Sequence, residues 1–96
     1  MIRKYNGEDL KSLEGVYLID FYADWCGPCK MLGQVLETLE DVNIIKINVD
    51  ENEELAKEYR VMSIPDMYIL KDGEIVKEIL GFRSKEDLEE ELKSIK

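Results

Sequence analysis

The sequence predicts a three-layer α/β sandwich around a mixed, mostly five-stranded central sheet, and three features carry this prediction. Two apolar, β-rich runs, residues 16–23 and 42–49, enclose a segment with helical spacing, which is the pattern of a βαβ unit with buried parallel strands. Two later apolar runs are separated by Asp72-Gly73, which favours a hairpin of antiparallel strands. An amphipathic segment closes the chain.

The elements of the first half follow in order. A short strand near Ile2 and a helix from about Glu8 to Leu13 precede the buried strand at residues 16–23. A helix is expected from about Cys26 to Glu40, followed by the strand at 42–49. The apolar positions that share one face of that helix are Met31, Leu32, Val35, Leu36 and Leu39.

In the second half, Asp50 is expected to cap a helix, because Glu53 follows three residues later. The hairpin strands are expected at residues 67–70 and 75–80. Ser84 then caps a last helix. The core face of that helix is formed by Leu88, Leu92 and Ile95.

Composition limits the classes of function. The 96 residues, 45% of them apolar, are enough for one domain, residues 1–96, with a single core. A net charge of -9 repels phosphate backbones and anionic lipids, which argues against nucleic acid and membrane partners. The longest apolar run is too short to span a bilayer, and the first residues lack a secretory signal. We expect a monomeric protein of the cytoplasm.

Chemistry is expected at Cys26 and Cys29, the only two cysteines. Because they are three residues apart, they cannot tie distant segments together. At the start of a helix, the dipole and unpaired N–H groups favour the thiolate that disulfide exchange requires. Gly27 allows a close approach, and Pro28 in the first turn loses no needed hydrogen bond. We therefore expect redox chemistry, with Cys26 as the exposed nucleophile.

A zinc site is the main alternative for this pair. Zinc needs about four ligands, and the chain has no further cysteine and no histidine. Carboxylates or a second copy of the chain would have to complete such a site. Two inert cysteines are the remaining alternative.

The segment from Ile19 to Met31, which contains Trp-Cys-Gly-Pro-Cys-Lys, resembles the active-site segment of thioredoxins. The resemblance continues through residues 46–50 and 61–65, the Asp72-Gly73 turn and Gly81. It implies the thioredoxin fold and a general protein disulfide reductase that needs no cofactor. It also implies disulfide-containing client proteins as partners and a thioredoxin reductase as electron donor.

Asp20 is the one charged residue in an apolar run that is typical of a buried strand. A buried carboxylate is either paired or has a raised pKa, so a structural ion pair and a solvent-facing position are the alternatives to a chemical role. The resemblance implies that Asp20 is the base that deprotonates Cys29. It also implies that Lys46 biases the titration of Asp20, although a lysine whose amine extends to water is an equally simple interpretation.

The resemblance also implies a docking surface for clients. Pro65 is expected in a cis peptide bond facing the cysteine pair, with the Ile64 backbone able to bond an extended substrate. Trp25 would supply exposed apolar surface, and Gly81 would leave room for a partner's backbone. The alternatives are a trans proline opening an edge strand, a core tryptophan, and a glycine that ends a strand.

The chain departs from the family pattern at three positions. Asp66 stands where a threonine is usual, and we expect it to add negative charge near the docking surface. Gln34 replaces a frequent proline that kinks the helix, so the kink is not assured here, although the preceding Gly33 allows bending. Tyr22 replaces a frequent tryptophan.

Two other functions remain open at this point. One is a dedicated, glutaredoxin-like redox carrier that serves a single partner. The other is a docking module in which the thiols are incidental. Gly-Pro between the cysteines favours a reductant.

Overall fold

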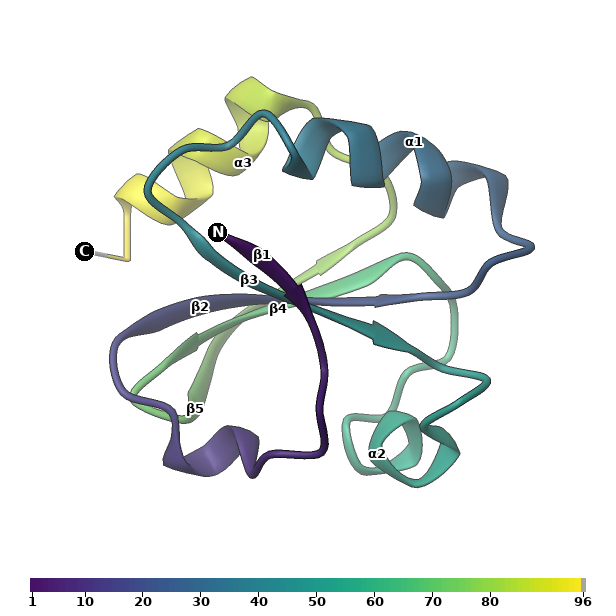
Figure 1. Ribbon diagram of the computed structural model, residues 1–96. Helices are drawn as coiled ribbons and strands as arrows, with labels where there is room; N and C mark the ends of the chain where they lie inside the picture. Colours follow the sequence, from purple (N-terminus) through teal and green to yellow (C-terminus); the bar gives the residue numbers. More distant parts are fainter. Residues whose placement is uncertain (96) are drawn as a thin grey trace.

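The computed structural model describes residues 1–95, and its elements alternate between strand and helix over most of the chain (Figure 1). In chain order they are β1 (Ile2–Lys4), a 3-10 turn (Leu10–Ser12), β2 (Val16–Tyr22), α1 (Gly27–Leu36), β3 (Asn43–Asn48), α2 (Glu53–Glu58), β4 (Asp66–Lys71), β5 (Glu74–Leu80) and α3 (Lys85–Lys93).

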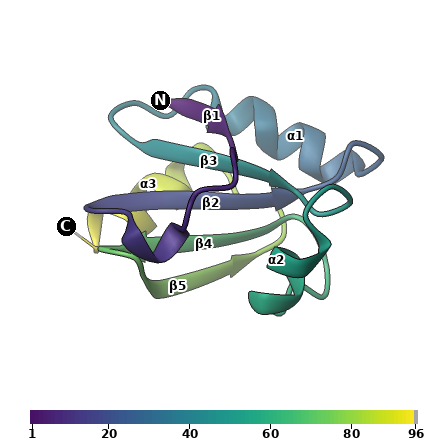
Figure 2. The same ribbon diagram turned by 60° about the horizontal axis from the view of Figure 1, so that its bottom comes forward.

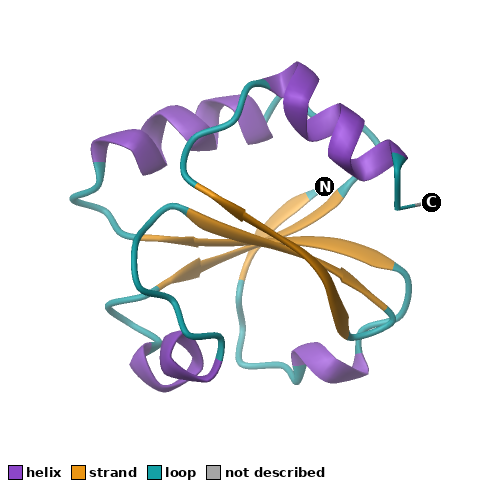
Figure 3. Ribbon diagram, turned by 180° about the vertical axis from the view of Figure 1, so that it is seen from behind, coloured by secondary structure: helices purple, strands orange, loops and turns teal. Residues whose placement is uncertain are grey.

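The five strands form one mixed sheet in the order β1-β3-β2-β4-β5, seen side by side in Figure 2. β1, β3 and β2 are parallel, whereas β4 runs antiparallel to β2 and β5 antiparallel to β4. α1 and α3 cover one face of the sheet, and α2 and the 3-10 turn lie on the other (Figure 3). The predicted three-layer sandwich is confirmed.

Alternation along β2 divides the interior into two cores, because successive side chains of a strand point to opposite faces. Leu18 belongs to the core beneath α1 and α3, together with residues such as Leu32, Leu36, Met67, Ile69 and Leu88. Ile19 and Phe21 belong to the opposite core, with Leu10, Ile45, Ile47, Tyr59, Tyr68 and Leu70. Asp20 therefore lies on the face that α1 covers.

α1 is shorter than the spacing predicted, since it ends at Leu36 instead of Glu40. Beyond it the backbone tightens into i→i+3 bonds, in which the N–H of Leu39 donates to the carbonyl of Leu36. Asp41 then adopts a φ of 59°, which turns the chain toward β3. Leu39 is buried although it lies outside the helix. The helical spacing of the apolar residues therefore predicted its burial correctly but not its secondary structure.

Asp50 does not cap α2, and this prediction is wrong. The helix begins after Asn52, whose side chain makes no capping bond, while the Asp50 carboxylate accepts a hydrogen bond from Trp25. The expected helix near residues 8–13 is a single 3-10 turn.

The predicted hairpin between β4 and β5 is confirmed. Asp72 and Gly73 have φ values of 52° and 82°. A type I′ turn, the common two-residue hairpin turn, requires positive φ at both of its central residues. A Cβ on Gly73 would lie only 2.0 Å from the carbonyl oxygen of Lys11. Only glycine fits this position.

Candidate active site

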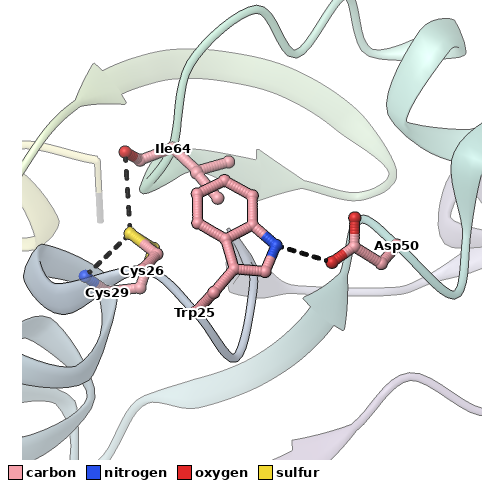
Figure 4. Close-up of a disulfide and its surroundings, with 5 residues drawn as sticks. All are labelled: Trp25, Cys26, Cys29, Asp50 and Ile64. Atoms are coloured by element: carbon pink, nitrogen blue, oxygen red, sulfur yellow. Dashed lines mark hydrogen bonds between the residues drawn. A yellow bond between two sulfur atoms is a disulfide. The ribbon is translucent and has the colours of Figure 1, made fainter.

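Cys26 and Cys29 form a disulfide between the end of β2 and the first turn of α1 (Figure 4). Cys26 is the N-cap of the helix, and its Sγ accepts a hydrogen bond of 3.2 Å from the backbone N–H of Cys29. Pro28 lies in the first turn, as predicted. After reduction, the same N–H and the positive end of α1 would stabilise a thiolate on Cys26.

Both cysteines are buried in this oxidised state, with exposed fractions of 5% for Cys26 and 2% for Cys29. The expectation of a plainly exposed Cys26 is therefore wrong here, although it is the more accessible of the two. An added Cβ on Gly27 would meet nothing within 4 Å. The space next to Gly27 is therefore open to solvent.

The loop before β4 lies against the disulfide. The Ile64–Pro65 peptide bond is cis, as expected, and the carbonyl oxygen of Ile64 is 3.9 Å from the Sγ of Cys26. The carbonyl of Pro65 accepts a 2.8 Å hydrogen bond from the N–H of Gly81, whose φ is 81°. Since β4 pairs with strands on both sides, Pro65 does not open an edge strand.

Trp25 lies beside the disulfide and is 70% exposed, so it is not a core residue. Its indole N–H donates a 2.8 Å hydrogen bond to Asp50 (Figure 4). Next to it is a hollow of about 370 Å³. Its lining is mostly apolar and consists of Trp25, Val49, Ala56, Val61, Met62, Ser63 and Ile64.

Asp20 is fully buried, and neither carboxylate oxygen has a hydrogen-bond partner. Burial raises the pKa of this carboxyl to about 6, and the charge of Lys46 opposes the rise. Lys46 is the register partner of Asp20 on β3, but within residues 1–95 the two make no ion pair. The solvent-facing and ion-paired interpretations are both wrong.

Comparison with known proteins assigns this arrangement to a family. The profile of the thioredoxin family matches residues 3–94. The chain belongs to the thioredoxin family. It is 55% identical to a thioredoxin of Bacillus subtilis (strain 168) over 82 residues, which cover 80% of this chain and 79% of that one.

Two further thioredoxins extend the comparison. One, from Staphylococcus epidermidis (strain ATCC 12228 / FDA PCI 1200), is 49% identical over 89 residues, 88% of this chain and 86% of its own. A solved structure of a mutant thioredoxin from Halobacterium salinarum NRC-1 superposes with a TM-score of 0.88 at 40% identity, covering 97% of this chain and 88% of its own. As a member of the thioredoxin family with the active-site cysteine pair, the chain is a thiol–disulfide oxidoreductase.

Two negative findings bear on the alternatives. Within residues 1–95, no three or more His, Cys, Asp or Glu side chains gather in a way that could hold a metal ion. Among the same residues, no helix has the length and apolar character needed to cross a membrane.

Asp66, the departure from thioredoxins at the start of β4, is not where it was expected. It is fully buried, and neither carboxylate oxygen has a hydrogen-bond partner, so it presents no exposed carboxylate on the docking surface. It shares a face of β4 with Tyr68, whose hydroxyl bonds Glu78 at 3.0 Å and the carbonyl of Tyr59 at 2.5 Å. Burial and the Glu78 carboxylate together raise the pKa of Asp66 to about 7.

We therefore expect Asp66→Asn to stabilise the protein at pH 8 and to have little effect at pH 4. A raised pKa means that the folded state keeps its proton to higher pH than the unfolded state, so the stability is complete below pH 3.8 and is lost as pH rises through about 7. The gain at pH 8 should be about 1–3 kcal/mol. Urea unfolding at both pH values measures it, with the exposed Asp24→Asn as the control. Equal effects at the two pH values would contradict the argument.

Gln34 lies on the exposed side of α1, and the helix continues through Gly33 and Gln34 without interruption. Gly33 instead faces Lys46, since an added Cβ there would lie 3.4 Å from the Lys46 ammonium. Tyr22, another departure, packs against the cluster formed by Ala23, Cys26 and Cys29.

Proposed function

We propose that this member of the thioredoxin family is a general protein disulfide reductase that works through Cys26 and Cys29. The observation that carries the proposal is the disulfide at the N-terminus of α1, placed against the cis Ile64–Pro65 bond beside an apolar hollow. This combination supplies a stabilised thiolate, a resolving sulfur in reach and a surface for an extended client segment.

The reaction has two exchange steps. In the first, the Cys26 thiolate attacks one sulfur of a client disulfide, and the other client sulfur leaves as a thiolate that takes up a proton. Asp20, buried on the face beneath α1, then accepts the proton of Cys29. The Cys29 thiolate attacks the Cys26 sulfur and releases the remaining client sulfur as a thiolate, which also takes up a proton. The client gains two electrons and two protons, and the Cys26–Cys29 disulfide results.

The residues around the pair have supporting roles in this proposal. Trp25, Ile64, Pro65 and Gly81 form the surface on which clients dock. Gly27, Pro28 and Lys46 tune the redox chemistry. The exposed indole of Trp25 and the outward space at Gly27 support these roles.

We propose disulfide-containing proteins as clients and a flavin-dependent thioredoxin reductase as electron donor, on the basis of family membership. The chain would act as a monomer with one domain in the cytoplasm, a compartment that keeps thiols reduced. Its net charge of -9 supports clients over nucleic acid or anionic membranes.

Insulin reduction tests the proposal. The reduced protein should cleave insulin disulfides with dithiothreitol as donor, whereas Cys26→Ser should not exceed the rate of dithiothreitol alone. A docking module with incidental thiols would be indifferent to the substitution.

The redox midpoint separates a reductant from an oxidant. Trp25 is the only tryptophan and adjoins the disulfide, so its emission should report the state of the pair in thiol–disulfide buffers. We expect a midpoint of about −270 mV, the value known for thioredoxin itself. A midpoint above roughly −200 mV would contradict the reductase and favour an oxidant or isomerase.

A further inference from the structure

Tyr22, one of the departures from the family pattern, and Gly33 of α1 both lie close to the Lys46 ammonium. The Nζ of Lys46 lies over the ring of Tyr22, 4.5 Å from its centroid, which is a cation–π arrangement. The same Nζ also lies 3.4 Å from where a Cβ on Gly33 would stand. The ammonium therefore lies close to both the Tyr22 ring and the backbone of α1.

The charge of the same ammonium favours the ionised form of the Asp20 carboxyl. Asp20 and Tyr22 are two residues apart on β2 and share a face, and Lys46 is the register partner of Asp20 on β3. The Asp20 carboxylate has no hydrogen-bond partner, so the nearby positive charge is its compensation. Lys46 is half-exposed, and without the ring its flexible side chain would extend into water.

A small hollow is shared by Tyr22, Lys46 and Cys29. Its volume is about 150 Å³, and it is lined by Tyr22, Ala23, Asp24, Cys29, Lys30 and Lys46. The resolving cysteine and the Tyr22–Lys46 pair therefore border the same space.

We propose that Tyr22 is a positioning residue for the resolving step, because its ring holds the Lys46 ammonium beside Asp20 and so sets the pH at which Asp20 takes the Cys29 proton. This rests on the proposed function of Cys29 as the resolving thiol. In this role Tyr22 acts on Asp20 through Lys46. Its packing against the cluster of Ala23, Cys26 and Cys29 is a separate contact, which the Lys46→Met background leaves in place.

The other ionisable groups around Asp20 do not replace Lys46. β4 faces Asp20 with the apolar Met67. Asp24 and Lys30, at the hollow, are exposed and opposite in charge. Besides burial, the charge of Lys46 is what shifts the pKa of Asp20.

The test is a direct titration of the Asp20 carboxyl by carbon NMR in the oxidised protein. Tyr22→Phe keeps the ring and should titrate like the parent. Tyr22→Leu removes the π face, and its Asp20 should bind the proton at least about threefold more tightly, in the direction of Lys46→Met. In the Lys46→Met background, Tyr22→Leu should change nothing further. Tyr22→Ile, a better strand former, is the second variant if Tyr22→Leu unfolds.

The resolving step supplies the second readout. The single-turnover rate of Cys29 attack on a mixed disulfide should shift its pH profile upward in Tyr22→Leu and stay in place in Tyr22→Phe. An unchanged titration in Tyr22→Leu, or a change that persists in Lys46→Met, would overturn the proposal. So would a shifted titration with an unmoved pH profile. The NMR titration needs no turnover, so a failure of the reductase assay would be recognised separately.

Discussion

Replacing Cys29 by Ser should produce a protein that captures its clients and cannot release them, whereas Cys26→Ser should capture none. Both variants should lose disulfide turnover by at least about 1000-fold, and the double variant should be no worse than either, because the two thiols act as a unit. Non-reducing electrophoresis of the reduced variants mixed with oxidised insulin measures the capture.

The structure gives the reason for this order. The Cys26 sulfur accepts a hydrogen bond from the backbone N–H of Cys29 at the N-terminus of α1. After reduction, this bond and the helix dipole should stabilise the Cys26 thiolate more than the Cys29 thiolate. In the reduced parent, iodoacetamide should therefore alkylate Cys26 far faster than Cys29 at neutral pH. Equal alkylation rates, or capture by Cys26→Ser, would reverse the assignment.

The burial of Asp20 was predictable because it depends on alternation within one strand. Leu18 and Tyr22 share its face, and the run around it is apolar, so its burial follows from the period of two. The strand order and the cis Ile64–Pro65 bond were accessible only through the resemblance to a family. No spacing within the chain encodes either.

Other features could not be predicted from the sequence, because they depend on contacts between segments that are distant in the chain. Asp66 follows a proline, and the sequence predicts it near the docking surface, yet it is the first residue of β4, between β2 and β5, and its side chain is fully buried. The apolar run that follows Asp66 was the available signal of a central strand. The pairing of Lys46 with Tyr22 depends on the β2–β3 register, which the sequence does not contain. Likewise, Asp50 has the spacing of a helix cap but bonds the indole of Trp25.

Asp20→Asn should stabilise the oxidised protein at pH 8 and slow the resolving step. The pKa of Asp20 is raised from 3.8 to about 6 because the carboxyl is buried. The folded state therefore binds the proton more tightly than the unfolded state, so the stability this gives is complete below pH 3.8 and is lost as pH rises through 6. A shift of this size corresponds to about 3 kcal/mol. Asparagine carries no charge at any pH and avoids this loss.

Urea unfolding of the oxidised protein at pH 4 and pH 8 measures the stability, and the exposed Asp24→Asn is the matched control. The parent should lose stability between the two pH values relative to Asp20→Asn, while Asp24→Asn should follow the parent. Resolution by Cys29 should slow by about 100-fold at pH 7 and recover at higher pH, where the thiol ionises unaided. If Asp20→Asn is less stable at both pH values, the carboxylate has a structural role. If resolution keeps its rate, Asp20 is not the base for Cys29.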